Sequence, residues 1–186
     1  MKTRKMKKTS RIELKEWPLD LLVDYAIKLH HRTIRRQGPQ TLALLRKVSD
    51  EHAVASRIAD LFAASLQALD SHLMKEEHVL FPFLYELFEA YEGGGNAAPM
   101  HCGTISNPIR VMMMEHDNEL ERHRQIELLT DGYTAPADAS DDYQEALRQL
   151  REFRDALLEH IYVENDLVFP GFEAVERQVV SLSMQD

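Results

Sequence analysis

The sequence predicts an all-α protein built as a four-helix bundle, with an extra short helix at its N-terminal end. Apolar residues recur three and four positions apart along most of the chain, the spacing that places them on one face of a helix. No segment shows the alternation of apolar and polar residues that is typical of a β-strand. Two loops rich in glycine, proline and small residues, near 92–104 and 131–140, separate the helical segments. Long helices packed around one core are therefore expected.

Local signals place the expected helices along the chain. Pro18 suits the first helical position, and the helix that it opens is expected to run to about residue 36. Gly38–Pro39 is expected to break that helix and to begin the next. Ser106 and Asn107 are expected to cap a later helix. The other expected helices cover about residues 39–52, 56–91, 108–130 and 141–170.

Composition limits the possible classes of protein. The chain has 186 residues, 44% hydrophobic and 28% charged, which predicts one globular domain with a substantial core. The net charge of -9 argues against nucleic acid or an anionic membrane as a partner. The one cysteine, Cys102, excludes an intrachain disulfide and a cysteine-rich zinc site.

The ends of the sequence suggest a domain layout and a location. We expect a basic, disordered tail over residues 1–16, the bundle over 17–175 and a C-terminal tail over 176–186. Charged residues interrupt any apolar run of signal-peptide length, and no stretch is apolar enough to span a membrane. A cytoplasmic protein is expected.

A repeated motif is the main candidate for a functional site. Residues 72–82 and 160–170 both read His-x3-Glu-x4-Phe-Pro, and the copies are 88 residues apart. Because residues four apart share a helix face, each copy presents an imidazole beside a carboxylate: His72 with Glu76, and His160 with Glu164. Two such pairs on facing helices indicate a metal site for iron, manganese, zinc or copper.

Two metal ions would need more ligands than the repeat supplies, and His31, His52 and His116 are candidates. If His31, His52 and His72 bind at one site, the chain must reverse twice between them, near Gly38 and again within 53–56. The competing interpretation is a helical bundle whose histidines are ordinary surface or core residues, or a zinc site.

The motifs resemble the hemerythrin-like (HHE cation-binding) family, and within it the di-iron proteins of iron–sulfur cluster repair. The resemblance runs from about residue 19 to Pro170. The last motif is His160-x3-Glu164, as in the repair group, where the oxygen carriers have His-x4-Asp. Many repair proteins carry an N-terminal domain with a cysteine pair, which we expect this chain to lack.

The resemblance implies a hemerythrin-like bundle that binds two iron ions bridged by an oxo or hydroxo group, with zinc or manganese as alternatives. Glu76 and Glu164 would bridge the ions. Glu77 is a weaker candidate because the second copy has Asn165 there, and His31 is preferred to His30 on spacing. His78, His101 and His123 match no family role. The implied metal ligands are His31, His52, His72, Glu76, His116, His160 and Glu164.

The function that the resemblance implies is protection against nitrosative or oxidative stress. Such a protein would donate iron to damaged iron–sulfur proteins, or bind and reduce nitric oxide. The alternatives are a carrier or sensor of dioxygen, and a metal-binding bundle without catalysis. The sequence leaves open whether the protein is an enzyme, which reductant it uses, what Cys102 does and whether it forms a homodimer.

Overall fold

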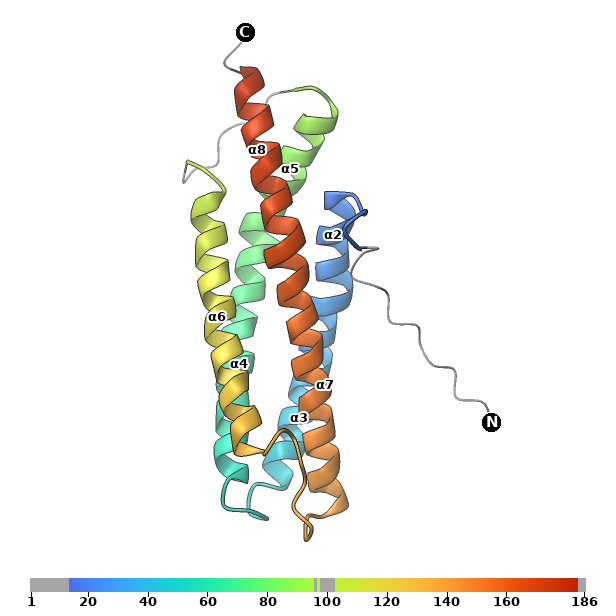
Figure 1. Cartoon of the computed structure of the whole chain (residues 1–186), viewed down its shortest axis with the longest axis vertical. Helices are drawn as coiled ribbons and strands as arrows, with labels where there is room; N and C mark the ends of the chain where they lie inside the picture. Colours follow the sequence, from blue (N-terminus) through green and yellow to red (C-terminus); the bar gives the residue numbers. More distant parts are fainter. Residues whose placement is uncertain (1–13, 96, 98–102, 184–186) are drawn as a thin grey trace, which may run out of the picture.

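Four helical runs form an elongated, antiparallel bundle in the computed structural model, which describes residues 14–95, 97 and 103–183 (Figure 1). The described residues contain no β-strand, and the all-α, four-helix architecture is confirmed. The elements are α2 (Leu19–Tyr25), η1 (Ala26–His31), α3 (Arg32–Lys47), α4 (Ala55–Lys75), η2 (Glu76–Leu80), α5 (Phe81–Glu92), α6 (Ser106–Leu129), α7 (Asp141–Val163), η3 (Glu164–Val168) and α8 (Phe169–Ser183).

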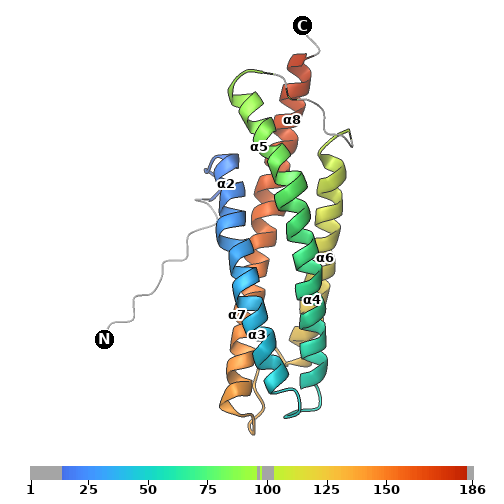
Figure 2. The same cartoon turned by 180° about the vertical axis from the view of Figure 1, so that it is seen from behind.

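Three of the four runs change from α-helix to π-helix and back without a turn. The first run is α2, η1 and α3, the second is α4, η2 and α5, and the fourth is α7, η3 and α8. Only α6 is α-helical throughout. Seen from behind, the turns after α3 and α6 lie together at one end, and the loop after α5 lies at the other (Figure 2).

The predicted break at Gly38–Pro39 is wrong, because Pro39 lies inside α3. Gly38 has a packing role instead. A Cβ atom at this buried position would lie 2.5 Å from Leu66 Cδ2 and 3.4 Å from Phe153 Cε2, so glycine lets α3 approach its neighbours closely. The chain between residues 31 and 72 therefore reverses once, between α3 and α4, and the expected double reversal is also wrong.

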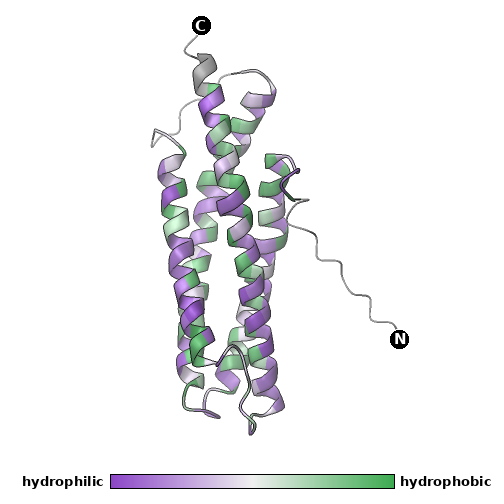
Figure 3. Ribbon diagram, viewed as in Figure 1, coloured by the Kyte–Doolittle hydropathy of each residue, from purple (hydrophilic) through white to green (hydrophobic). Residues whose placement is uncertain are grey.

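The apolar core is divided into two parts along the bundle axis. The upper core cluster, in the view of Figure 1, joins α2, α5 and α8 and includes Phe81 and Phe169, while the lower core cluster joins α3, α4 and α7 and includes Phe62 and Phe153. Hydrophobic residues face inward along the helices and polar residues face outward (Figure 3). Where the two clusters meet, the core contains buried histidine and glutamate side chains.

The structure describes the two ends of the chain to different extents. Most of the basic tail, and also His101 and Cys102, lie outside the described residues. At the other end, α8 continues to Ser183, so no change of secondary structure marks residue 176. No helix in the described part of the chain has the length and apolar character needed to cross a membrane.

Candidate metal centre

Six of the seven predicted ligands come together in one buried layer, to which all four runs contribute. Each of the six side chains is at most 3% exposed. We call this group the His/Glu layer; it consists of His31, His72, Glu76, His116, His160 and Glu164.

In each motif copy a π-turn begins at the glutamate and lies directly before the Phe-Pro pair. Pro82 and Pro170 have no backbone N–H, so the α-helical bond to the residue four positions earlier is missing. The helix closes through wider turns: the Phe81 N–H donates to the Glu76 carbonyl, and the Phe169 N–H to the Glu164 carbonyl, five residues back in each case. Such π-turns are frequent at functional sites. Here the glutamate is the first residue of the π-turn in both copies.

Two imidazoles define a first candidate metal position, which we call position A. The Nε2 atoms of His72 and His116 lie 3.0 Å apart. One carboxylate oxygen from each glutamate lies nearby: Glu76 Oε1 is 3.2 Å from His72 Nε2, and Glu164 Oε2 is 3.2 Å from His116 Nε2. Two nitrogens and two oxygens from three different runs therefore converge on one point.

The other two imidazoles, His31 and His160, define position B. A ring nitrogen of His160 also lies within 4.8 Å of ligand atoms of His72, His116 and Glu164. His31 Nε2 lies 3.5 Å from Glu76 Oε2 and 3.5 Å from Glu164 Oε1. His160 Nδ1 lies 3.4 Å from that same oxygen of Glu164. Each glutamate thus directs one oxygen toward position A and the other toward position B.

The buried polar atoms of the layer fit bound cations. Seven of them have no hydrogen-bond partner among the residues that the structure describes: both oxygens of Glu76, both oxygens of Glu164, both ring nitrogens of His160 and Nε2 of His31. Leaving buried polar groups unpaired is costly, and buried charge more so. Four imidazoles with two carboxylates suit iron, manganese, zinc or copper better than calcium or magnesium, which prefer oxygen ligands.

The pKa values of three layer residues also fit a metal site. Burial, and then the nearby Glu76 carboxylate, raise the pKa of Glu164 well above its usual range. Burial and the neighbouring imidazoles lower the pKa of His160 well below its usual range. For His116, burial and the nearby His72 lower the pKa to about 4. These histidines are therefore neutral at pH 7, the form that binds metals.

Three of the four imidazoles are oriented by a hydrogen bond at Nδ1, the ring nitrogen that faces away from the layer. In each case Nδ1–H donates to a side-chain oxygen, which leaves the Nε2 lone pair directed into the layer. The acceptors are Glu77 for His31 (2.7 Å), Glu115 for His72 (2.8 Å) and Asn165 for His116 (2.9 Å).

The sequence contained a signal for two of these acceptors. Glu77 and Asn165 follow the glutamate in the two motif copies, and their difference in residue type made Glu77 look like a weak ligand candidate. Each instead accepts a hydrogen bond from a histidine of a neighbouring run. No pattern pointed to Glu115, because its link to His72 exists only once α4 packs against α6.

The phenylalanine of each motif copy packs on a layer histidine. Phe81 stacks on His31 with ring centroids 5.8 Å apart and an interplanar angle of 21°. Phe169 stacks on His116 at 6.2 Å and 12°. The two copies therefore repeat the same local arrangement, and the aromatic rings close the layer on the side of the upper core cluster.

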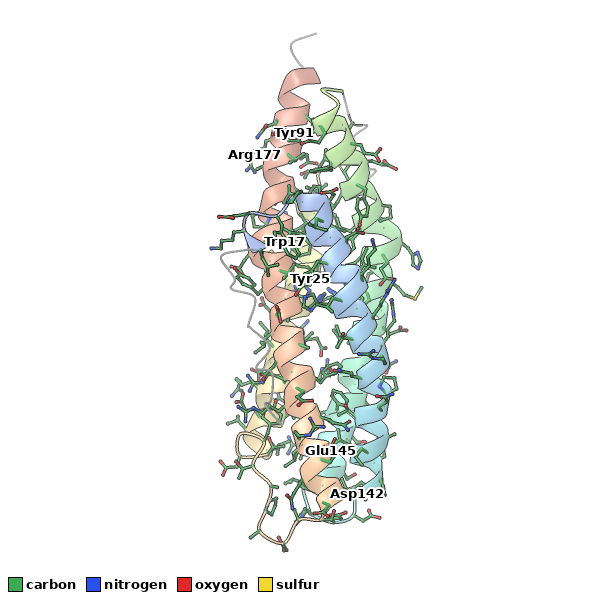
Figure 4. The ribbon with its side chains drawn as sticks, turned by 90° about the vertical axis from the view of Figure 1, so that its right-hand side faces the viewer. Trp17, Tyr25, Tyr91, Asp142, Glu145 and Arg177 are labelled. Carbon is green, nitrogen blue, oxygen red and sulfur yellow. The ribbon has the colours of Figure 1, made fainter. Side chains whose placement is uncertain are left out.

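His52 is the one predicted ligand that does not join the layer. It lies between α3 and α4, and its ring centroid is 4.6 Å from that of Tyr143. Asp142, next to Tyr143, marks the lower end of the bundle in Figure 4, whereas Tyr25, whose ring contacts His30, lies far above it. Because α3 continues as one helix away from His31, the chain carries His52 to the end of the bundle.

We therefore expect His52→Ala to leave the bound metal unchanged, with a stability loss of about 1 kcal/mol or less from the lost ring contact. His72→Ala, at position A, is the comparison and should lose metal. Metal analysis of the two purified variants after reconstitution checks this, and loss of metal in His52→Ala would show that His52 reaches the layer.

Comparisons with known proteins agree with the geometry. Residues 22–172 match the family described as the hemerythrin HHE cation binding domain. The chain is 32% identical over 163 residues to the iron-sulfur cluster repair protein YtfE of Musicola paradisiaca, covering 84% of this chain and 68% of the relative. It is 34% identical over 157 residues to the probable iron-sulfur cluster repair protein of Haemophilus influenzae, covering 80% of this chain and 63% of the relative.

A third relative is matched over most of its own length. It is the iron-sulfur cluster repair protein DnrN of Neisseria gonorrhoeae, which is 32% identical over 154 residues. The match covers 82% of this chain and 90% of the relative. The family match over residues 22–172 includes all six residues of the His/Glu layer.

Proposed function

Since the chain belongs to the hemerythrin HHE cation-binding domain family, we propose that it is a non-haem di-iron protein that acts in iron–sulfur cluster repair under nitrosative or oxidative stress. The observation that carries the proposal is the pair of positions A and B, joined by the oxygens of Glu76 and Glu164. Three relatives named as repair proteins support the process. We also propose that the protein acts in the cytoplasm.

Within this proposal, the six residues of the His/Glu layer hold two iron ions. Burial keeps the imidazoles of His116 and His160 in the neutral form that binds a metal. When bound in the ferrous form, the pair supplies two electrons and an open coordination position for a diatomic ligand such as nitric oxide. The hydrogen bonds at Nδ1 fix the orientation of His31, His72 and His116. Donation of iron to a damaged iron–sulfur protein is the second activity that we include.

A pocket gives small molecules a route to position A. It has a volume of about 190 Å³, lies between α4 and α6, and is lined by both imidazoles of that position, His72 and His116. Lys75 and Arg122 also line it. We call it the α4/α6 pocket. Its size suits a diatomic ligand. His31 and His160, the imidazoles of position B, do not line it.

Reconstitution with ferrous iron under anaerobic conditions tests the proposal. We expect about two iron ions per chain, a number set by the two positions, and near-ultraviolet charge-transfer absorption of a coupled ferric pair after oxidation. Addition of nitric oxide to the reduced protein should yield nitrous oxide. Protein that binds no iron would overturn the proposal, and a stable, reversible spectrum with dioxygen would favour an oxygen carrier instead.

A further inference from the structure

A second buried polar cluster lies between α4 and α6, outside the His/Glu layer. Its members are Ser65 on α4 and Glu119 and His123 on α6, which are 0%, 4% and 3% exposed. Ser65 Oγ lies 2.6 Å from Glu119 Oε2 and 3.2 Å from His123 Nε2. The serine hydroxyl therefore joins the carboxylate to the imidazole in one continuous chain, which we call the Ser65 chain.

The hydrogen bonds of the Ser65 chain run in one direction. A neutral His123 that carries its proton on Nε2 donates to Ser65 Oγ, and the Ser65 hydroxyl donates to the Glu119 carboxylate. His123 Nδ1 is then left with a free lone pair, and it has no partner within the described structure although it is buried. A buried acceptor without a partner needs an explanation, and a place in a proton relay supplies one.

Each end of the Ser65 chain reaches a different pocket. Glu119 lines the α4/α6 pocket, which also contacts His72 and His116. His123 lines a pocket of about 180 Å³ on the other side of α6, together with Arg154 and residues of α7; we call it the α6/α7 pocket. The chain therefore links the pocket beside position A to a separate opening of the bundle.

The charges around the chain favour proton transfer. Burial raises the pKa of Glu119, although Ser65 and Arg122 partly oppose the shift, and the more distant His72 acts in the same sense as Arg122. Burial, followed by the positive charges of Arg122 and Arg154, lowers the pKa of His123 to about 4. Burial thus favours the neutral form of both groups, which is the form in which each can take part in a proton relay.

We propose that Glu119 is the proton donor to a ligand in the α4/α6 pocket, and that Ser65 and His123 return a proton to it from the α6/α7 pocket. The proposal rests on the proposed function, because reduction of nitric oxide consumes protons. Two molecules of nitric oxide, two electrons and two protons give one nitrous oxide and one water. The electrons are those that the proposed function assigns to the ferrous pair, and the protons pass along the Ser65 chain.

One transfer can be followed atom by atom. Glu119 starts as a carboxylate that accepts from Ser65 at Oε2 and from Arg122 at Oε1; the Ser65 hydroxyl proton passes to Oε2, and the carboxyl then gives that proton to the ligand. Ser65 takes the proton from His123 Nε2, and His123 Nδ1 takes one from water in the α6/α7 pocket. A turn of the imidazole and of the hydroxyl restores the starting arrangement.

A separate proton route has a physical reason. A ligand that fills the α4/α6 pocket displaces its water, so protons that entered through the same mouth would have to pass the ligand. The cluster also differs from a hydrolytic triad, since Glu119 contacts the serine instead of the histidine, and Ser65 is fully buried.

Two variants interrupt the Ser65 chain with little change in shape. Ser65→Ala removes the bridging hydroxyl, and Glu119→Gln keeps a hydrogen-bond acceptor but cannot carry the proton. Ser71→Ala is the matched control, because Ser71 lines the same pocket but is exposed and lies outside the chain. Iron content and the rate of nitric oxide binding should be the same in all three variants as in wild-type protein.

The test follows proton uptake when the iron-loaded, reduced protein is mixed with nitric oxide in weak buffer containing a pH indicator. We expect Ser65→Ala and Glu119→Gln to slow uptake about 10- to 100-fold, and Ser71→Ala to leave it unchanged. Nitrogen-15 NMR of histidine in zinc-loaded wild-type protein at pH 7 should show His123 neutral with its proton on Nε2.

Each outcome decides the proposal. Unchanged proton uptake in both chain variants would overturn the relay and leave the proposed function standing. A His123 protonated on Nδ1 would also overturn it, because that nitrogen could not accept. Wild-type protein without iron would overturn the proposed function and the relay together.

Discussion

Replacing Glu164 with glutamine is expected to abolish the binding of both metal ions, while the metal-free protein stays at least as stable as wild type. The reason lies in the two oxygens of Glu164, one directed toward His116 at position A and the other toward His31 at position B. An amide has one oxygen, no charge and an NH₂ group that points protons at a cation. We expect metal affinity to fall by more than about 100-fold at both positions.

The stability side of this prediction follows from the metal-free layer. Glu164 and Glu76 are both fully buried and no hydrogen bond satisfies their oxygens. Because burial and the nearby Glu76 carboxylate raise the pKa of Glu164, the metal-free protein favours the neutral acid, which glutamine resembles in shape. The change in unfolding free energy should therefore lie between zero and a gain of about 2 kcal/mol.

Two measurements and one control check the prediction. Metal analysis after reconstitution gives the metal content, and urea unfolding of chelator-treated protein gives the free energy of unfolding. Asp166→Asn is the control, because it makes the same carboxylate-to-amide change at an exposed position of the same π-turn. It should keep its metal. A Glu164→Gln protein that still bound two ions would rule out bridging by this residue.

The sequence predicted the parts of the site that depend on local geometry. His72 with Glu76, and His160 with Glu164, were found because residues four apart share a helix face whatever the helix packs against. His31 and His116 were already candidates, with His52, because two ions need more ligands than the repeat supplies, and the family resemblance then implied all three as ligands. The Phe-Pro pair that follows each copy was also a local signal, and its structural meaning is the π-turn at the glutamate.

What the sequence could not supply depends on how the helices cross. Gly38–Pro39 looked like a chain reversal, but close packing against Leu66 keeps the helix continuous, and this continuity takes His52 away from the layer. The contact of Glu115 with His72 likewise depends on a crossing of two helices. Side chains that are remote in sequence and follow no repeat leave no periodic signal.

The Ser65 chain illustrates the same limit. Ser65 is 54 residues from Glu119 and 58 from His123, and no motif or spacing in the sequence connects them. His123 matched no family role and was set aside. Its burial, its unpartnered Nδ1 and its place between two pockets became visible only in the folded protein.

Phe153→Ala is expected to show the opposite behaviour from Glu164→Gln: a large loss of stability with the metal retained. Phe153 is 1% exposed, packs edge-on against Phe62 at 4.9 Å and stacks on His123 at 5.9 Å. Its removal leaves a cavity where α3 approaches most closely at Gly38, and it should cost about 3–5 kcal/mol of unfolding free energy. A domain of this size has roughly 5–15 kcal/mol in total, so the variant should still fold.

The metal should survive this substitution because the damage is confined to the lower core cluster. Phe153 belongs to that cluster, whereas the rings that stack on the layer histidines, Phe81 and Phe169, belong to the upper one. Urea unfolding gives the loss of stability, and metal analysis of the folded protein gives the metal content; Phe153→Leu, with a smaller cavity, should lose less stability and keep its metal too. Folded Phe153→Ala without metal would mean that the lower core also sets the geometry of the layer. Metal bound at the wild-type level would instead mean that the layer and the upper cluster hold the site, and that the lower half of the bundle contributes stability.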